Sequence, residues 1–215
     1  MMRYERKFRI EHMNAAALEQ LLRMHPAAFY SLYPDRQINN IYLDTPQLTT
    51  WNDNIYGVNQ RKKYRIRWYG QELERVRSAK LELKIKHNEL GRKESFDIAD
   101  FELEQALQIC ADLPQLDPSF PHLQPSLINT YQRSYWQSFD GRFRVTIDRD
   151  MCFYPYSGTL FSGSVDLLNP MRDPALILEV KYETADDPLV EQITQHLPFR
   201  QSRHSKYVTG VLLTR

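Results

Sequence analysis

A chain of 215 residues with a net charge of +1 can bury a substantial core and is not a polycation. Its composition, 42% hydrophobic and 26% charged, is typical of a globular protein and argues against disorder. The two cysteines, Cys110 and Cys152, have no CxxC neighbour, which argues against a disulfide framework or a zinc site and favours a reducing, cytoplasmic compartment. The first residues show no signal peptide, and no run of about eighteen apolar residues predicts a membrane span.

The first half of the chain alternates predicted strands with two helices. Residue patterning predicts strands at 3–10, 38–45, 60–69, 79–87 and 92–96, with a turn near 88–91. A helix is predicted over 12–24, with Asn14 as its N-cap. Thr45 and Pro46 predict the start of a short helix that ends at Gly57.

The second half continues the mixture of helices and strands. A helix is predicted over 99–113, followed by a loop with four prolines at 114–125. The remaining predictions are a helix leading into a strand at 126–139, strands at 141–151 and 175–183, a helix opening at Asp187 and Pro188, and a closing helix at 205–215. No repeat or linker divides the chain, so we expect one domain, 1–215, of the α+β class with a large antiparallel sheet or barrel.

The predicted strand at 60–69 has a face made of cations. Successive side chains of a strand point to opposite sides, so one face carries Arg61, Lys63, Arg65 and Arg67. Between positions 61 and 93 the sequence has twelve Lys or Arg residues against four Glu residues. A local surplus of cations in a nearly neutral chain favours a binding site for an anion.

Other predicted strands also alternate charged with apolar side chains. Their charged faces carry Glu5 and Lys7, Glu82, Lys84 and Lys86, Arg144 and Asp148, and Glu179 and Lys181. One interpretation is a set of ordinary amphipathic strands with polar faces in water. The other is a closed barrel whose polar faces point inward and whose apolar faces are covered by helices. Unpaired buried charges are very unfavourable, so this interior must hold water and an anion with many oxygens.

Phosphate chains fit that description. Arginine binds phosphate through two parallel hydrogen bonds, and carboxylates among the cations are the ligands that Mg²⁺ or Mn²⁺ prefers. The alternation therefore favours a closed antiparallel β-barrel with flanking helices and a site for polyphosphate inside it.

Eight segments in order support a family assignment: "YERKF", "IYLDT", "KYRIRWYG", "LELKIKH", "YQRSY", "VTIDRD", "ILEVKY" and "SKYVTG". Together they resemble the VTC domain, the polyphosphate polymerase domain of the vacuolar transporter chaperone complex. That domain belongs to the triphosphate tunnel metalloenzymes, which are related to the CYTH phosphatases and cyclases. The resemblance covers about residues 3 to 210. It implies a β-tunnel in which the γ-phosphate of ATP is transferred to a growing polyphosphate chain with Mn²⁺ or Mg²⁺.

The resemblance also implies roles for individual residues. The cations expected at the transferring phosphates are Arg65, Arg67, Lys84 and Arg133. Further phosphate-binding residues are expected at Lys7, Lys86, Lys181, Arg203, Ser205 and Lys206, with Lys206 gating the tunnel mouth. The expected metal ligands are Glu179, Glu5 and Glu82. By strand parity Glu82 and Asp148 face inward. They are either metal ligands or a general base, or else they pair with a neighbouring cation such as Arg144.

The sequence departs from its relatives in two respects. The ExExK motif that opens many CYTH proteins is absent, and only Glu5 and Lys7 fit its spacing, which favours the VTC-like branch over a two-metal hydrolase. The sequence also contains neither an SPX domain nor membrane segments, which raises the hypothesis of a separate membrane-protein partner.

Three other functions remain alternatives. The same tunnel with water as the acceptor would be a triphosphatase that hydrolyses ATP or inorganic triphosphate. A non-catalytic module would bind polyphosphate without turnover. Single-stranded nucleic acid is disfavoured by the near-zero net charge and by carboxylates among the cations. No Walker A or GxGxxG motif is present, so the common nucleotide-binding folds are not expected.

Overall fold

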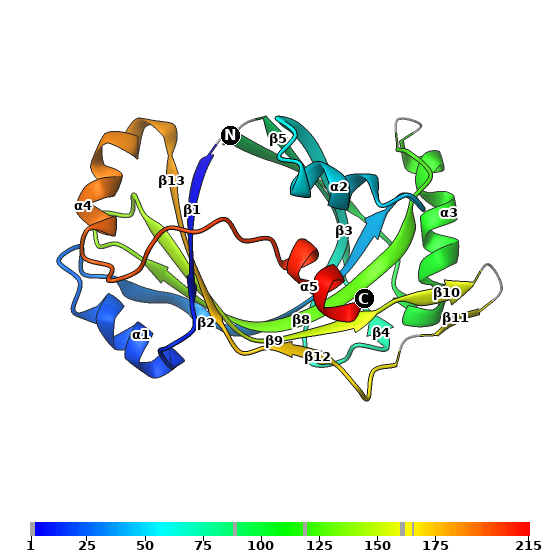
Figure 1. The fold of residues 1–215 in the computed structure, drawn as a ribbon, viewed down its shortest axis with the longest axis horizontal. Helices are drawn as coiled ribbons and strands as arrows, with labels where there is room; N and C mark the ends of the chain where they lie inside the picture. Colours follow the sequence, from blue (N-terminus) through cyan, green and yellow to red (C-terminus); the bar gives the residue numbers. More distant parts are fainter. Residues whose placement is uncertain (1–2, 88–89, 118–119, 160–161, 165) are drawn as a thin grey trace.

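The computed structural model describes residues 3–87, 90–117, 120–159, 162–164 and 166–215. Its main feature is an antiparallel sheet whose hydrogen bonds close into a ring, in the order β9-β13-β1-β6-β5-β3-β2-β8 and back to β9 (Figure 1). The ring strands are β1 (Arg3–Ile10), β2 (Tyr30–Asp44), β3 (Gln60–Tyr69), β5 (Lys80–His87), β6 (Leu90–Asp97), β8 (Gln124–Gln137), β9 (Arg144–Pro155) and β13 (Leu176–Glu183). The expected α+β fold with a closed antiparallel barrel is confirmed.

Short elements and helices complete the chain. The helices are α1 (Ala15–Arg23), α2 (Thr49–Ile55), η1 (Leu103–Gln105), α3 (Ala106–Leu116), η2 (Thr184–Leu189), α4 (Val190–Thr194) and α5 (Lys206–Thr214). The short strands are β4 (Arg75–Val76), β7 (Phe101–Glu102), β10 (Ser157–Thr159), β11 (Ser162–Ser164) and β12 (Met171–Asp173). Within the described part of the chain, none of the helices has the length and hydropathy needed to cross a bilayer.

Helices α1 and α4 cover one side of the barrel and α3 covers another (Figure 1). Under α1 and α4, the outward side chains of β1, β9 and β13, including Phe8, Ile147 and Leu178, form one buried apolar cluster. Near α3, Ile66 of β3 and Leu81 of β5 belong to a second cluster. These two clusters confirm that apolar strand faces point outward and are covered by helices.

Helix α5 lies within the outline of the ring rather than outside it (Figure 1). Its Tyr207 stacks on Tyr42 of β2 with ring centroids 4.9 Å apart, and both belong to a third buried apolar cluster with Val211. Part of the barrel interior is therefore apolar and is occupied by this helix. The sequence predicted the helix but not its position.

The barrel has a narrow seam between β1 and β6. Among the described residues these strands share one register pair, Arg3 with Gly91, whereas β1 and β13 pair along their whole length. Beyond that pair, the segment before α5 lies against β1. The Ser202 amide donates to the Lys7 carbonyl at 2.8 Å, and the Arg9 amide donates to Ser202 Oγ at 3.0 Å. This segment thereby anchors the start of α5 to β1.

One sequence prediction was wrong and others were imprecise. Residues 126–139 do not begin with a helix, because β8 is a single strand over Gln124–Gln137. Residues Leu127–Tyr131 are all buried, so the period-two pattern of a half-buried strand is absent. Strand β2 begins at Tyr30 rather than at 38, and β9 runs from Arg144 to Pro155 rather than over 141–151.

Two helices begin later than predicted. Helix α3 starts at Ala106, because Phe101 and Glu102 pair with β4. Helix α2 starts at Thr49, since the Asp44 carboxylate accepts the amides of Thr50 and Trp51 and Leu48 has a left-handed backbone. Positions 88–89 of the predicted turn at 88–91 lie outside the described residues. Positions 118–119 of the predicted loop lie outside them as well.

Candidate functional site

The inner face of β3 carries the four cations predicted from the sequence. Arg61, Lys63, Arg65 and Arg67 are half-buried, while the intervening residues of the strand's middle are buried on the other side. Their neighbours across the sheet are Lys86, Lys84, Glu82 and Lys80 of β5, in that order. The alternation of charge along these strands therefore reflects an inward polar face.

Glu179 of β13 is a meeting point of four cations. Its carboxylate oxygens lie 3.1 Å from Lys7 Nζ, 2.8 Å from Lys181 Nζ, 3.5 Å from Arg133 Nη2 and 3.7 Å from Lys206 Nζ. Burial alone would raise the pKa of Glu179, but Lys181 and Lys7, followed by Lys206 and Arg133, hold it well below its ordinary value. Glu179 is thus an anion that brings four cations together.

Glu5 extends this group along β1. Its carboxylate lies 2.9 Å from Lys7 Nζ and 3.0 Å from Lys84 Nζ of β5. Burial opposes ionisation of Glu5, but the nearby lysines, Lys7 foremost, hold its pKa well below the ordinary value. Lys7 therefore lies between Glu5 and Glu179, and its own pKa is raised by these two carboxylates despite burial.

Asp148 of β9 forms the deepest part of the site. It is fully buried, and its carboxylate accepts two hydrogen bonds from the Arg133 guanidinium, at 2.5 and 2.7 Å. Lys206 Nζ lies 2.5 Å from Oδ2 of the same carboxylate. Burial would raise the pKa of Asp148, but Arg133 and Lys206 lower it overall. Asp148 therefore serves as a counter-ion that fixes both cations.

A second ion-pair group centres on Glu82 of β5. Arg65 donates to its Oε2 through Nε at 2.7 Å, and Lys93 donates to its Oε1 at 2.7 Å. Arg67 Nη1 lies 3.8 Å from the same carboxylate. Tyr131 joins the two groups, since its hydroxyl accepts from Arg67 Nη2 at 3.1 Å and its ring lies under the Lys206 ammonium, 4.8 Å from the centroid.

Lys63 differs from these paired cations. Its Nζ donates a 2.8 Å hydrogen bond to Ser205 Oγ, the N-cap of α5. Burial lowers the pKa of Lys63 well below its ordinary value, and the charges of Lys7, Lys84 and Arg61 lower it further. A half-buried ammonium that faces other cations is unfavourable unless an anion binds, so this part of the interior favours binding of one.

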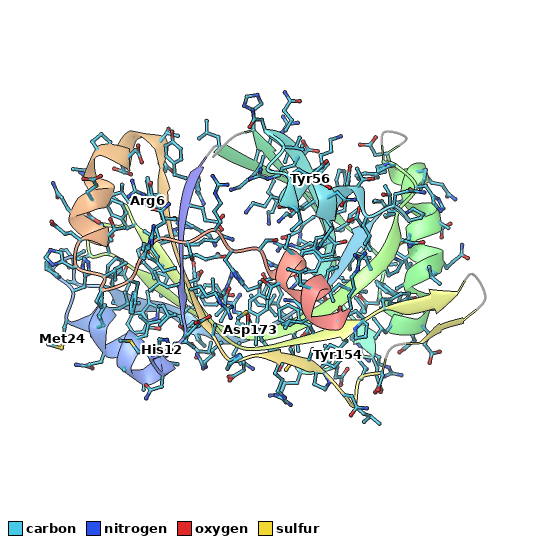
Figure 2. The ribbon with its side chains drawn as sticks, in the orientation of Figure 1. Arg6, His12, Met24, Tyr56, Tyr154 and Asp173 are labelled. Atoms are coloured by element: carbon cyan, nitrogen blue, oxygen red, sulfur yellow. The ribbon has the colours of Figure 1, made fainter. Side chains whose placement is uncertain are left out.

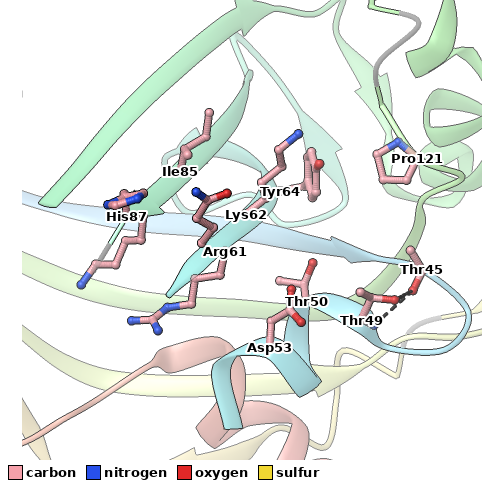
Figure 3. A pocket seen from close by; sticks show the side chains of 12 residues that line it. Thr45, Thr49, Thr50, Asp53, Arg61, Lys62, Tyr64, Ile85, His87 and Pro121 are labelled. Atoms are coloured by element: carbon pink, nitrogen blue, oxygen red, sulfur yellow. Dashed lines mark hydrogen bonds between the residues drawn. The ribbon is translucent and has the colours of Figure 1, made fainter. Parts of the chain in front are cut away.

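A pocket of about 370 Å³ adjoins the cationic ends of β3 and β5 (Figure 3). Arg61 and Lys62 of β3 and Lys86 and His87 of β5 line it, facing Asp53 of α2. Arg61 and Lys86 belong by parity to the inner faces of their strands. Tyr64 and Ile85, from the outward faces of the same strands, also line it, so the pocket lies at the ends of β3 and β5 and touches both their inner and their outer faces.

The sequence matches the VTC domain over residues 2–215. The chain belongs to the VTC domain family. No match was found among curated proteins. This assignment confirms the family resemblance identified in the sequence.

Two solved structures share the fold of this VTC domain. A candidate adenylate cyclase from Vibrio parahaemolyticus has a TM-score of 0.53 at 15% identity, with 96% of this chain and 97% of the other covered. The PH1819 protein from Pyrococcus horikoshii OT3 has a TM-score of 0.51 at 15% identity, with 98% of each chain covered. At this identity the likeness establishes the fold alone.

Most predicted site residues of the VTC domain lie in the interior. The ion-pair groups contain Lys7, Arg65, Arg67, Lys84, Arg133, Lys181, Lys206, Glu5, Glu82 and Glu179. Ser205 joins them through Lys63, and Lys86 lines the pocket at their edge. Arg203 is exposed and outside these groups. Lys206, expected to gate the tunnel mouth, is buried against Asp148.

Two residues of the site were not predicted from the sequence, and a third was assigned the wrong partner. Lys93 and Tyr131 were not singled out, although both contact predicted site residues. The suggested partner of Asp148, Arg144, is exposed, and Arg133 takes that place. Lys93 lies opposite Lys84 in the register of β5 and β6, so its side chain is on the same inner face.

Two carboxylates of this VTC domain lie close enough together to share a metal ion with bound phosphates. Among the described residues, no group of three or more His, Cys, Asp or Glu side chains is placed to hold one. Glu5 and Glu179 nevertheless meet at the same ammonium, 2.9 and 3.1 Å from Lys7 Nζ. Mg²⁺ is commonly bound by one or two carboxylates together with substrate phosphates. Glu5 and Glu179 fit that mode because they meet at one ammonium, whereas the cations paired with Glu82, namely Arg65, Arg67 and Lys93, contact no second carboxylate in the ion pairs described above.

Proposed function

We propose that this VTC domain is a polyphosphate polymerase that transfers the γ-phosphate of ATP to the end of an inorganic polyphosphate chain. Family membership supports a phosphate substrate, and the cationic interior supports a polyanion with many oxygens. The observation that carries the choice of a polymerase over a hydrolase is the state of the inner carboxylates. Each one is held by at least two cations.

A hydrolase has to activate water, and a general base works best when its pKa is near the working pH. Despite burial, Arg65 and Arg67 keep the pKa of Glu82 far below that range, and Arg133 and Lys206 lower the pKa of Asp148. Carboxylates in this state are poor bases for water. A terminal phosphate of a polyphosphate chain is already an anionic nucleophile and needs no base, so the site suits it as the acceptor.

In the proposed reaction, a terminal oxygen of the acceptor chain forms a bond to the γ-phosphorus of ATP. The bond between that phosphorus and the β,γ-bridging oxygen breaks, and ADP leaves with the electron pair. Arg65, Arg67, Lys84 and Arg133 hold the transferring phosphates and stabilise the charge of the transition state.

The other predicted residues have supporting roles in this proposal. Lys7, Lys181, Lys206 and Ser205 bind the flanking phosphates, and Lys86 binds the chain near the pocket. Glu5 and Glu179 would hold Mn²⁺ or Mg²⁺, which would neutralise negative charge on the phosphates. Glu82 positions Arg65 and Arg67 through the ion pairs described above.

Incubation of the purified protein with ATP and Mn²⁺, followed by a gel stained for polyphosphate, tests the proposal. We expect a ladder of polymer that is lost in an Arg65→Ala/Arg67→Ala variant. An Arg75→Ala/Arg77→Ala variant is the matched control, because these two arginines are exposed and lie outside the site. Orthophosphate without polymer would make the protein a triphosphatase, and tight binding without turnover would make it a binding module.

A separate membrane-protein partner is a second element of the proposal, motivated by the resemblance to a domain of the vacuolar transporter chaperone complex. Fractionation of cells that express the protein would test it. Recovery with membranes through a co-purifying protein supports the partner, and recovery only in the soluble fraction counts against it.

A further inference from the structure

Three tyrosines surround one arginine at the end of the inner face opposite the pocket. The Arg36 guanidinium carbon lies 5.5 Å from the ring centroid of Tyr33 and 5.9 Å from those of Tyr69 and Tyr135. Tyr33 and Tyr135 also pack edge to face, with centroids 5.9 Å apart. We call these four residues the aromatic cluster.

The aromatic cluster continues the inner faces that carry the phosphate-binding cations. Tyr69 follows Arg67 by two positions on β3, and Tyr135 follows Arg133 by two positions on β8. Residues two apart on a strand share a face and are about 6.6 Å apart. Arg36 is the register partner of Arg133 across β2 and β8. The cluster therefore lies one strand step beyond the ion-pair groups.

The cluster is open to solvent, unlike the aromatic residues of the core. Tyr33 is 49% exposed and Tyr69 is 52% exposed, whereas Tyr131, farther inside, is 2% exposed. Strand β2 begins pairing with β3 at Ile38, so the part that holds Tyr33 and Arg36 extends beyond β3 and is paired with β8. Exposed rings with a guanidinium between them offer flat faces to a planar ligand.

We propose that the aromatic cluster binds the nucleobase of the nucleoside triphosphate whose phosphates occupy the cationic interior. Bases stack on aromatic rings and on arginine planes, and such stacking tolerates different bases. The inference rests on the proposed function for the identity of the phosphate donor. It adds that the donor is a nucleotide whose base lies at the Tyr69 end of the inner face. Its ribose would then lie between the aromatic cluster and the two arginines Arg67 and Arg133.

Calorimetric titration of ATP and of inorganic tripolyphosphate in EDTA tests this proposal, because both ligands share the phosphates and only ATP has a base. We expect Tyr69→Ala and Tyr33→Ala each to weaken ATP binding about tenfold and to leave tripolyphosphate binding unchanged. Tyr69→Phe should bind ATP like the wild type, and GTP should behave like ATP in all variants.

Tyr56→Ala is the matched control. Tyr56 is 80% exposed at the C-terminal end of α2 (Figure 2) and takes no part in the ring contacts of the aromatic cluster. A thermal melt of each variant establishes that it is folded. The fluorescence of 1,N6-ethenoadenosine triphosphate gives a second readout, which we expect to be quenched by the wild type and less by Tyr69→Ala.

Two results would overturn the proposal: unchanged ATP affinity in Tyr69→Ala and Tyr33→Ala, or an equal loss of affinity for ATP and tripolyphosphate. Failure of the polymerase proposal has a different signature. A wild-type protein that makes no polymer, but whose ATP affinity alone depends on Tyr69 and Tyr33, would refute the polymerase and support the base site.

Discussion

Lys7 of β1 and Glu179 of β13 are register partners, and their Nζ and Oε1 atoms lie 3.1 Å apart inside the barrel. The contact joins a strand at the start of the chain to one near its end, in the middle of the largest ion-pair group. Glu179 is the member of that group with the most cation contacts. Its charge should therefore determine both the stability of the empty protein and its response to an anion.

Glu179→Gln preserves the shape of the side chain and removes the charge. Removing one partner of a buried ion pair costs about 3–5 kcal/mol, so we expect a lower melting temperature. Added tripolyphosphate should raise the melting temperature more in the variant than in the wild type, because it replaces the missing negative charge. Polymer formation should be lost, since Glu179 is also a proposed metal ligand.

Glu183→Gln is the control for this experiment, since Glu183 lies on the same strand and is exposed. Scanning calorimetry with and without tripolyphosphate measures the effect. Equal stabilisation of the wild type and Glu179→Gln by tripolyphosphate would contradict the assigned role of Glu179.

Arg65→Lys keeps the charge but loses the planar guanidinium. Arg65 donates to Glu82 through Nε and Nη2, which fixes its orientation toward the interior. A lysine is a point charge without this geometry, so we expect kcat to fall about tenfold or more, with a smaller change in tripolyphosphate affinity. Steady-state kinetics with ATP and Mn²⁺ provides the measurement, and the exposed Arg77→Lys is the control. A wild-type kcat in Arg65→Lys would show that charge alone suffices.

The sequence was informative wherever one strand face is apolar and the other polar. The alternation in β3 and β5 identified the inward cations, because neighbouring residues on these strands have opposite environments. In β8 both faces are buried over Leu127–Tyr131, so the pattern no longer distinguished a strand from a helix. Burial on both sides comes from α5 inside the ring, which is a tertiary feature.

The pairing of charges could not be predicted. Asp148 and Arg133 meet because β8 and β9 are adjacent in a particular register, which includes an irregularity between Thr130 and Gln132. Next to that irregularity, Asp150 has a φ of 55° and is exposed, although residues two apart on a regular strand, such as Asp148 and Asp150, share a face. Lys206 reaches Asp148 from a helix rather than from a strand, so strand parity gave no information on it.

The half-buried position of Lys63 among other cations predicts that anion binding depends on pH. A bound polyanion favours the charged form of Lys63. Because the pKa of Lys63 is lowered in the empty protein, its ammonium loses the proton at a pH below about 10.4, the ordinary pKa of lysine. Tripolyphosphate affinity should therefore fall as the pH rises through this lowered pKa, with proton uptake on binding. Titrations in EDTA over a series of pH values measure this fall.

Lys63→Arg should make the fall in affinity shallower, since arginine stays charged. Part of the fall should remain, because burial lowers the pKa of Lys84 to about 8. Lys62→Arg is the matched control, because Lys62 is the next residue on β3 and is exposed. An identical pH profile for the wild type and Lys63→Arg would refute this role of Lys63.

Gly210→Ala should destabilise the protein by displacing α5. A Cβ at Gly210 would overlap Leu127 Cδ2 and Phe153 Cδ1, although alanine favours a helix. Such overpacking costs about 1–3 kcal/mol, which corresponds to a loss of roughly 2–12 °C in melting temperature. Because α5 carries Lys206 and is capped by Ser205, tripolyphosphate affinity should fall as well. Gly91→Ala, whose Cβ would meet its neighbours at 3.8 Å or more, is the control. A Gly210→Ala variant with unchanged melting temperature would show that α5 does not pack tightly inside the barrel.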